Sequence, residues 1–150
     1  MYTVYLALAA VAVAAGQILI AGAPVAATLL LWLLVIKVGL GGLWAFMGHF
    51  FTPDDVARHI GWPAGNPFQR EVAFTNLAIG LCGLLCFFFR DGFWLATIVF
   101  TSVFLLGAFS VHVTDIKQSG NRHPGNAGPV FFADIIVPIA LWGLYAATVV

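Results

Sequence analysis

Two histidines and three carboxylates lie near the ends of the long apolar stretches of this chain. They are His49, Glu71, His112, Asp115 and Asp134. If the stretches run back and forth as helices, these five side chains reach one level of the molecule although they are far apart in sequence. Histidine and carboxylate ligands drawn from several helices are typical of iron, copper, manganese and zinc sites. The pattern therefore predicts a transition-metal or redox site built from these five candidates.

The same residues also allow a structural interpretation. The Glu-x-x-His signature of di-iron bundles is absent, and His112-x-x-Asp115 is a single i,i+3 pair. Polar side chains in the last turn of a membrane helix can simply reach the lipid headgroups and form hydrogen bonds there. Glu71 can also form an ion pair with Arg70 or Arg122. Both interpretations stay open at this point.

Lys37 is the most unusual polar residue because it lies in the middle of a long apolar segment. It is about 13 residues, or roughly 20 Å, from either end of that segment, where a lysine costs about 2.5–3.5 kcal/mol. We expect compensation by Ser102, by a backbone carbonyl, or by Asp134 through water. The favoured interpretation is a polar cavity that runs from Lys37 to the histidine and carboxylate layer. Two further polar residues are expected within the membrane, Gln17 and Asn76.

The composition requires a membrane environment for the segments that carry these residues. Of the 150 residues, 62% are hydrophobic and 8% are charged, and the mean hydropathy is +1.03. A soluble domain of this size needs a charged surface of about 25% of its residues. The net charge is zero, so no basic field is present to bind a nucleic acid. Soluble enzymes, extracellular modules and nucleic-acid binders are thereby excluded, and the lipid bilayer is the expected partner.

The apolar stretches predict one all-α domain, residues 1–150, formed by a bundle of about five transmembrane helices. A spanning helix needs about 20 mostly apolar residues. The count falls to four if the turn at Gly22–Pro24 does not form a hairpin. The predicted spans are 2–21, 25–51, 71–89, 93–112 and 129–149.

Two loops on one face, residues 52–70 and 113–128, are predicted to be structured, and we call this face the loop side. Thr52 as N-cap and Pro53 as first helical residue predict a short helix over 53–60. Asn66 is the expected cap of the next helix, whereas residues 113–128 are rich in turn formers.

Basic residues predict the orientation of the chain in the membrane. The loop side carries four of them and the opposite face carries only Arg90. The positive-inside rule then places the N-terminus and the larger loops in the cytoplasm, and the expected location is the bacterial inner membrane. The four on the loop side are Arg58, Arg70, Lys117 and Arg122.

Small residues gather on the predicted helices at positions where helices can pack closely. Cys82 and Cys86 share a helix face and are expected to pack, not to react. Small residues allow membrane helices to approach one another. Those expected to do so are Ala78, Gly80 and Gly83, then Gly39, Gly41 and Gly42, and finally Gly107 and Ala108.

Several motifs of the two loops resemble a family of small bacterial integral membrane proteins known only as a domain of unknown function. The resemblance covers about residues 45–140 and implies an integral membrane protein. A fainter similarity, in size and helix arrangement, is to the DoxX-like membrane proteins linked to quinol oxidation and redox homeostasis. Neither resemblance assigns a catalytic residue. The motifs are Gly48-His49-Phe50-Phe51-x-Pro53-Asp54, Ile60-Gly61-Trp62-Pro63-x-Gly65-Asn66-Pro67-Phe68-Gln69-x-Glu71, Asn76, and His112-x-x-Asp115 with the segment from Asn121 to Asp134.

Three functions are compatible with these observations. The first is a membrane-embedded metal-binding or redox site at the loop side. The second is a non-enzymatic accessory subunit of a membrane complex or a homo-oligomer, as the small-residue faces and the absence of a soluble domain allow. The third is a small transporter or proton pathway through Lys37 and Asp134. The sequence leaves open whether the protein is an enzyme.

Overall fold

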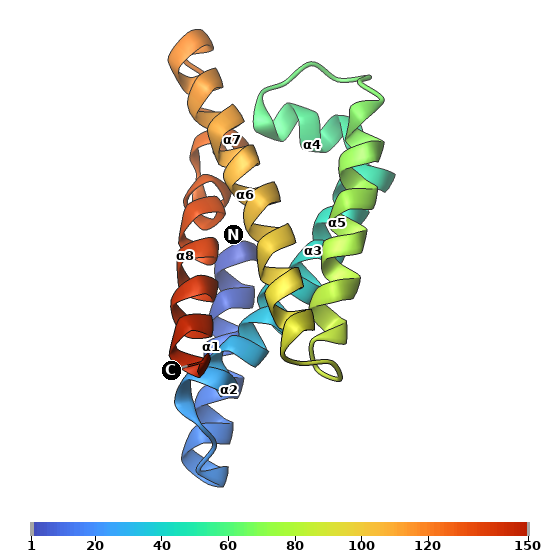
Figure 1. The fold of residues 1–150 in the computed structure, drawn as a ribbon. Coiled ribbons are helices and arrows are strands. Elements are labelled where there is room, and N and C mark those ends of the chain that lie inside the picture. The colour runs from blue at the N-terminus through green and yellow to red at the C-terminus, as the bar shows by residue number, and fades with distance from the viewer. Residues whose placement is uncertain (1, 150) are drawn as a thin grey trace.

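The computed structural model describes residues 2–149, and this part of the chain is helical with no strand. The chain runs up and down as a bundle, with α4 lying across one end and the turn between α1 and α2 at the other (Figure 1). This confirms the predicted all-α membrane bundle. The elements are α1 (Tyr2–Ala21), α2 (Val25–Trp32), η1 (Leu33–Leu40), α3 (Gly41–Phe51), α4 (Pro53–Ile60), α5 (Phe68–Leu85), α6 (Gly92–Ser119), α7 (Pro124–Ala127) and α8 (Pro129–Val149).

Four helical segments are long and apolar enough to cross a membrane. They are Tyr2–Ala21, Val25–Phe51, Gly92–Ser119 and Pro124–Val149. The third predicted span corresponds to α5, which lies beside α3 and is not among these four, because its first half carries several polar and charged residues. The protein is therefore an integral membrane helical bundle, with α5 as a less apolar fifth long helix.

The loop between the last two spans is more helical than predicted. Residues 113–128 were expected to form turns, but α6 continues to Ser119 and α7 forms a further helical turn from Pro124. No glycine or proline interrupts residues 113–119, and the helix ends only where Gly120 adopts a left-handed φ of 66°. The clustering of turn formers in the second half of the segment concealed this continuation.

The long second helix contains a π-helical segment that the sequence analysis did not predict. Residues Leu33–Leu40 form η1, which carries Lys37 and joins α2 to α3 without a break. π-Helical hydrogen bonding is rare and concentrates at functional positions of helices. The backbone is therefore irregular at the one lysine in the middle of this span.

A very close helix contact joins η1 and α3 to α5 through glycines. A Cβ added to Gly42 would lie 2.6 Å from the backbone nitrogen of Gly80, and one added to Gly83 would lie 2.5 Å from that of Gly39. Only residues without a side chain permit this backbone approach. The packing predicted for these four glycines is confirmed. Gly107 has nothing within 4 Å of an added Cβ, so the contact predicted for it is wrong within this chain.

The helix α4 forms a lid over the loop side, and two glycines allow it to dock (Figure 1). The predicted helix over 53–60 is confirmed. Gly61 has a φ of 87°, and a Cβ there would lie 2.7 Å from the side chain of Asn121. A Cβ on Gly125 of α7 would lie 2.8 Å from the ring of His59. Residues 53–67, which we call the lid, are thus held against α7.

The two predicted helix caps have different outcomes. Thr52 makes no side-chain cap to α4, and its hydroxyl donates to the carbonyl of Gly48 at the end of α3 instead. Asn66 accepts from the backbone N–H of Phe68 at the start of α5, as expected of a cap. The Thr52 prediction is wrong because the preceding helix offers its hydroxyl a free carbonyl one turn back.

Replacing Gly80 with leucine is expected to separate α5 from α3 and to destabilise the bundle. The new side chain would meet backbone atoms, and overpacking of this kind costs about 1–3 kcal/mol or more. The measurement is the free energy of unfolding in mild detergent. Gly107→Leu is the matched control, since that position is open. Equal stability of the two variants would show that the glycine contact is dispensable.

Candidate functional site

His112 of α6 and Asp134 of α8 form a buried pair near the loop side. They are 6% and 4% exposed, and His112 Nε2 lies 3.9 Å from Asp134 Oδ2. The other ring nitrogen, Nδ1, donates to Asn126 Oδ1 at 2.7 Å, because the Asn126 amide nitrogen already donates to the carbonyl of Asn121 at 2.9 Å. This network leaves Nε2 directed at the carboxyl group, at a distance too long for a direct hydrogen bond.

Asp134 has hydrogen-bonding capacity that no side chain described in residues 2–149 uses. Its Oδ2 is buried and has no hydrogen-bond partner. Pro138 lies four residues later in the same helix and has no N–H, so the backbone carbonyl of Asp134 also lacks its helical donor. A buried polar group without a partner is costly, and in a membrane helix it usually marks function. Asp134 is therefore the strongest candidate for a functional residue in this chain.

Lys37 is the basic partner of this site. It is half-buried on η1, and its ammonium group extends to the level of Gly41, one turn nearer the loop side. Lys37 and Asp134 are close enough to attract one another electrostatically. The hydroxyl of Ser102 does not bond to Lys37 and instead accepts from the indole N–H of Trp142 at 3.1 Å. Within residues 2–149 Lys37 forms no ion pair within 4 Å, so its compensation by Asp134 through water stays a prediction.

A second group of side chains connects the lid to this pair. The ring of Trp62 stacks on His112, with centroids 5.6 Å apart and an interplanar angle of 22°. Trp62 Nε1 donates to Asp115 Oδ2 at 2.8 Å. The amide of Asn121 donates to the same oxygen at 2.6 Å and to the carbonyl of Ile60 at 3.0 Å. The end of the lid is therefore attached to α6 directly above His112.

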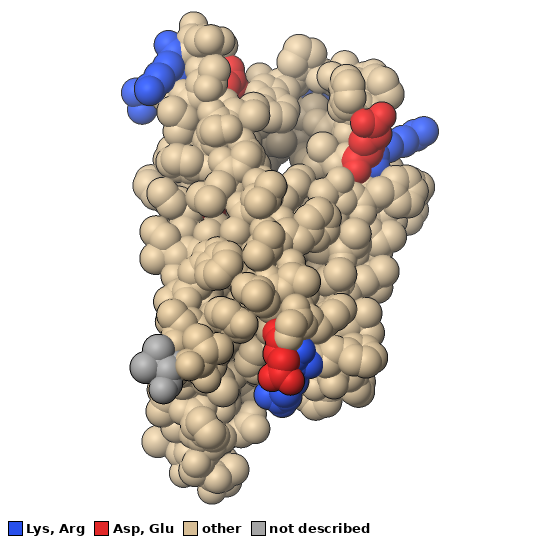
Figure 2. Space-filling model, viewed as in Figure 1, with Lys and Arg blue, Asp and Glu red and all other residues tan. Residues whose placement is uncertain are grey.

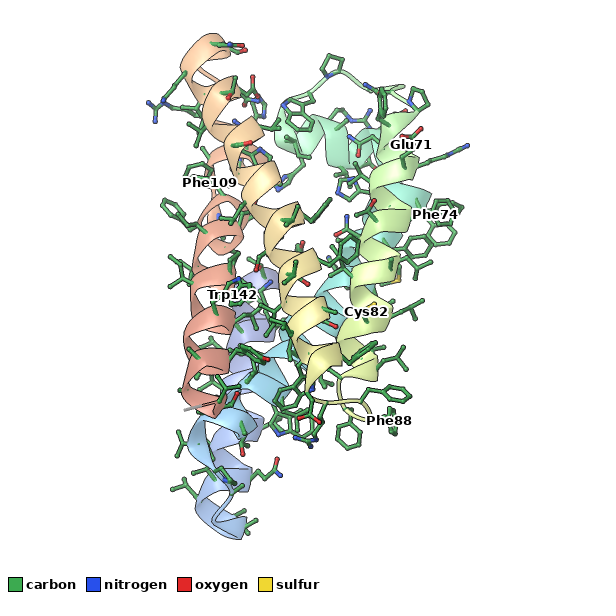
Figure 3. The ribbon with its side chains drawn as sticks, viewed as in Figure 1. Glu71, Phe74, Cys82, Phe88, Phe109 and Trp142 are labelled. Carbon is green, nitrogen blue, oxygen red and sulfur yellow. The ribbon has the colours of Figure 1, made fainter. Side chains whose placement is uncertain are left out.

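The remaining predicted ligands lie elsewhere. His49 donates through Nδ1 to the side chain of Gln69, which connects α3 with α5. Glu71 is exposed on α5, across the molecule from α6, and forms no ion pair with Arg70 or Arg122 (Figure 3). No group of three or more His, Cys, Asp or Glu side chains in residues 2–149 could hold a metal ion. The structure thus brings together three of the five candidates, and the metal site stays a prediction.

The other two polar residues predicted within the membrane have local partners. Gln17 accepts from the indole N–H of Trp32 at 2.7 Å, which joins α1 to α2. Asn76 donates to the carbonyl of Val72 in its own helix at 2.9 Å. Both side chains therefore have structural hydrogen bonds and lie outside the site.

Sequence reasoning missed two residues that define the site, Asn126 and Pro138. Asn126 is fully buried although it lies among turn formers, and nothing in the pattern of that loop indicates its burial. Pro138 carried a usable signal, because a proline inside an apolar helix always frees a carbonyl one turn earlier. That carbonyl belongs to Asp134.

The fold and site define a multi-pass α-helical membrane protein with a buried His112 and Asp134 pair and a half-buried Lys37 beneath a docked lid. Over residues 1–149 the chain matches the model of a family described as "Family of unknown function (DUF6790)", and it belongs to that family. No match was found among curated proteins or among solved structures. The predicted membership in a family of unknown function is confirmed, whereas similarity to DoxX-like proteins is not shown. Bacterial origin, orientation and partner subunits stay predictions.

Replacing Asn126 with leucine is expected to leave the Nδ1 hydrogen of His112 without an acceptor. Loss of a buried partner of this kind costs about 1–3 kcal/mol, and the lid should loosen as well. The measurements are the free energy of unfolding in mild detergent and the rate of proteolysis within residues 61–67. Gln118→Leu removes an amide from an exposed position of α6, the helix that carries His112, and serves as control. Equal proteolysis of the two variants would contradict the assigned network.

Replacing Lys37 with methionine is expected to destabilise the bundle more than replacing Lys37 and Asp134 together. The single variant removes the cation whose electrostatic attraction favours the buried carboxyl group, so Asp134 loses a favourable interaction. The double variant Lys37→Met, Asp134→Leu removes both charged groups and should recover most of that loss. Unfolding in mild detergent measures the difference. Additive effects of the two substitutions would show that the residues do not interact.

Proposed function

We propose that this protein handles protons within the membrane, with Lys37, Asp134 and His112 as the groups that hold and exchange them. The observation that carries the proposal is the buried Oδ2 of Asp134, which has no hydrogen-bond partner and lies 3.9 Å from His112 Nε2. A carboxyl and an imidazole can each hold or release a proton. Ionisable residues at membrane depth are characteristic of proton relays in pumps and transporters.

The 3.9 Å distance between His112 Nε2 and Asp134 Oδ2 suits transient proton transfer better than a permanent hydrogen bond. A hydrogen bond between His112 and Asp134 requires about 3 Å, so a small side-chain rotation or one bridging water is needed to connect them. Asn126 fixes the ring of His112 through Nδ1, which leaves Nε2 as the nitrogen that accepts or donates. The proton therefore has one defined route between the two side chains.

Irregular backbone on both sides of this route supports the proposal. Lys37 lies within the π-helix η1, and Asp134 lies one turn before Pro138. Interrupted helices in a membrane are tolerated where they line a cavity or bind an ion or substrate. Such segments can also change their hydrogen bonding with small movements, as a relay between two faces of the membrane requires.

Among the three functions considered from the sequence, this geometry favours the small transporter or proton pathway. The metal or redox site needs three or more ligands at one place, and residues 2–149 do not assemble them. The accessory-subunit interpretation has no single side-chain arrangement in its favour. The proposal instead uses Asp134, which is ionisable and is one of two side chains in residues 2–149 with a buried polar atom that has no hydrogen-bond partner.

Reconstitution into liposomes that enclose a pH-sensitive dye tests the proposal. With a potassium gradient and valinomycin to set the potential, the wild-type protein is expected to move protons faster than empty liposomes. Asp134→Asn, which keeps the shape of the side chain and cannot ionise, should lower this rate roughly a hundredfold. Asp55→Asn is the control, because Asp55 is exposed on α4 and pairs with Arg58.

A second measurement covers the case in which the protons are held and not conducted. Infrared difference spectra recorded across a pH titration report the protonation of buried carboxyl groups, and the signal is expected to disappear in Asp134→Asn. A protein that neither conducts protons nor shows this carboxyl signal would overturn the proposal.

A further inference from the structure

We propose that the cavity beside Trp62 binds an ammonium group, carried by a small amine or by a lipid headgroup. The cavity has a volume of about 350 Å³ and lies between the lid and the upper part of α6, where the molecular surface is hollowed (Figure 2). This volume falls within the range of small-molecule sites, and the cavity is widely open to the surface. Its lining residues are Trp62, Ser110, Val111, Thr114, Asp115 and Gln118.

The charge of the lining selects a cation. Asp115 is the one charged side chain among these residues, and none of them is basic. The hydrogen bonds from Trp62 and Asn121 both fall on Oδ2, and the hydroxyl of Ser119 also lies within reach of the carboxylate. A carboxylate has acceptor capacity on both oxygens, so Oδ1 can still accept from a ligand. An anion at this place would be repelled by Asp115 and would find no basic partner in the cavity wall.

The two hydroxyl groups of the lining strengthen this selection. The hydroxyl of Ser110 donates to the carbonyl of Gly107 at 2.7 Å, and that of Thr114 donates to the carbonyl of Ser110 at 2.9 Å. Because each hydroxyl has a single hydrogen, both oxygens offer only lone pairs to the cavity. The wall therefore presents acceptors, which suit the N–H donors of an ammonium group.

Trp62 completes the site with an aromatic surface. The face of an indole attracts cations more strongly than that of any other side chain, and aromatic groups beside a carboxylate are the usual means of recognising ammonium. The orientation of the indole is fixed by its hydrogen bond to Asp115 and by its stacking on His112. The arrangement is therefore preorganised, and a ligand need not order the side chains when it binds.

The site lies where two sources of ammonium are available. Asp115 and Gln118 belong to the last turns of α6 at the loop side, near the level expected for lipid headgroups. Amines dissolved in water and ammonium-bearing lipids reach this level equally. The inference is independent of the proposed proton function, because it concerns equilibrium binding and involves no proton movement.

Saturation-transfer NMR on the full-length protein in mild detergent tests the inference, with ethanolamine and tetramethylammonium as probes and acetate as the anionic control. Both cations are expected to bind and acetate is not. Asp115→Asn should weaken cation binding about tenfold, since it removes the charge and keeps the shape. Glu71→Gln changes an exposed carboxylate that is also at the loop side but lies on α5, and it should leave cation binding unchanged.

A second variant is needed because Asp115→Asn could lose cation binding simply by misfolding. Thr114→Lys places an ammonium group in the cavity from an exposed position that forms no bond to the lid, and it should abolish binding of both probes. Binding of acetate as strong as that of the cations, or cation binding unchanged in both variants, would overturn the inference. Failure of both cations to bind the wild-type protein would do the same.

The source of the ammonium group is decided in nanodiscs. If a lipid headgroup occupies the site, ethanolamine binding should be weaker in phosphatidylethanolamine nanodiscs than in nanodiscs of an uncharged glycolipid without an ammonium group, because the headgroup competes. If a soluble amine is the ligand, binding should be the same in both. Either result supports an ammonium site, whereas absence of ethanolamine binding in both lipids contradicts it.

Discussion

The structure depends on the constraint that a polar group inside an apolar bundle must find its partner within the protein. Most polar side chains here have a hydrogen-bond partner nearby. Gln17 accepts from Trp32, and Asn76 donates to the carbonyl of Val72. Two side chains are exceptions, because the hydroxyl oxygen of Thr101 and Oδ2 of Asp134 are buried without a partner, and only Asp134 is ionisable. The stability of the surrounding helices has to compensate for that cost, and the close glycine contact of α3 and η1 with α5 supplies part of it.

One continuous set of contacts connects the lid with the buried pair of His112 and Asp134. Trp62 bonds to Asp115 and stacks on His112, and His112 in turn faces Asp134. Lys37 attracts the same carboxyl group electrostatically. A ligand that moves Trp62 would therefore alter the surroundings of His112 without touching it. The proposed ammonium site and the proposed proton site are thus adjacent, and each can influence the other through a single aromatic ring.

The sequence predicted the level at which the site residues lie along their helices, but it did not predict the side to which each side chain points. Grouping polar residues by their level correctly placed His112, Asp115 and Asp134 near one face, and it drew attention to Lys37. It could not separate them from His49, which pairs with Gln69, or from Glu71, which is exposed on the far side of the bundle. The level of a residue follows from its number along a helix. The side to which it points depends on how that helix is rotated against its neighbours.

The amino-acid sequence alone determined the membrane environment, the helical class, the helix over residues 53–60 and the glycines of the close helix contact. These features follow from apolar length, from turn residues and from side-chain size, which are local properties. Only the tertiary structure decided that Asn126 is buried against His112, that α6 continues to Ser119, and that η1 is π-helical around Lys37. Each of these depends on packing between segments distant in sequence, and no local pattern encodes which segments meet.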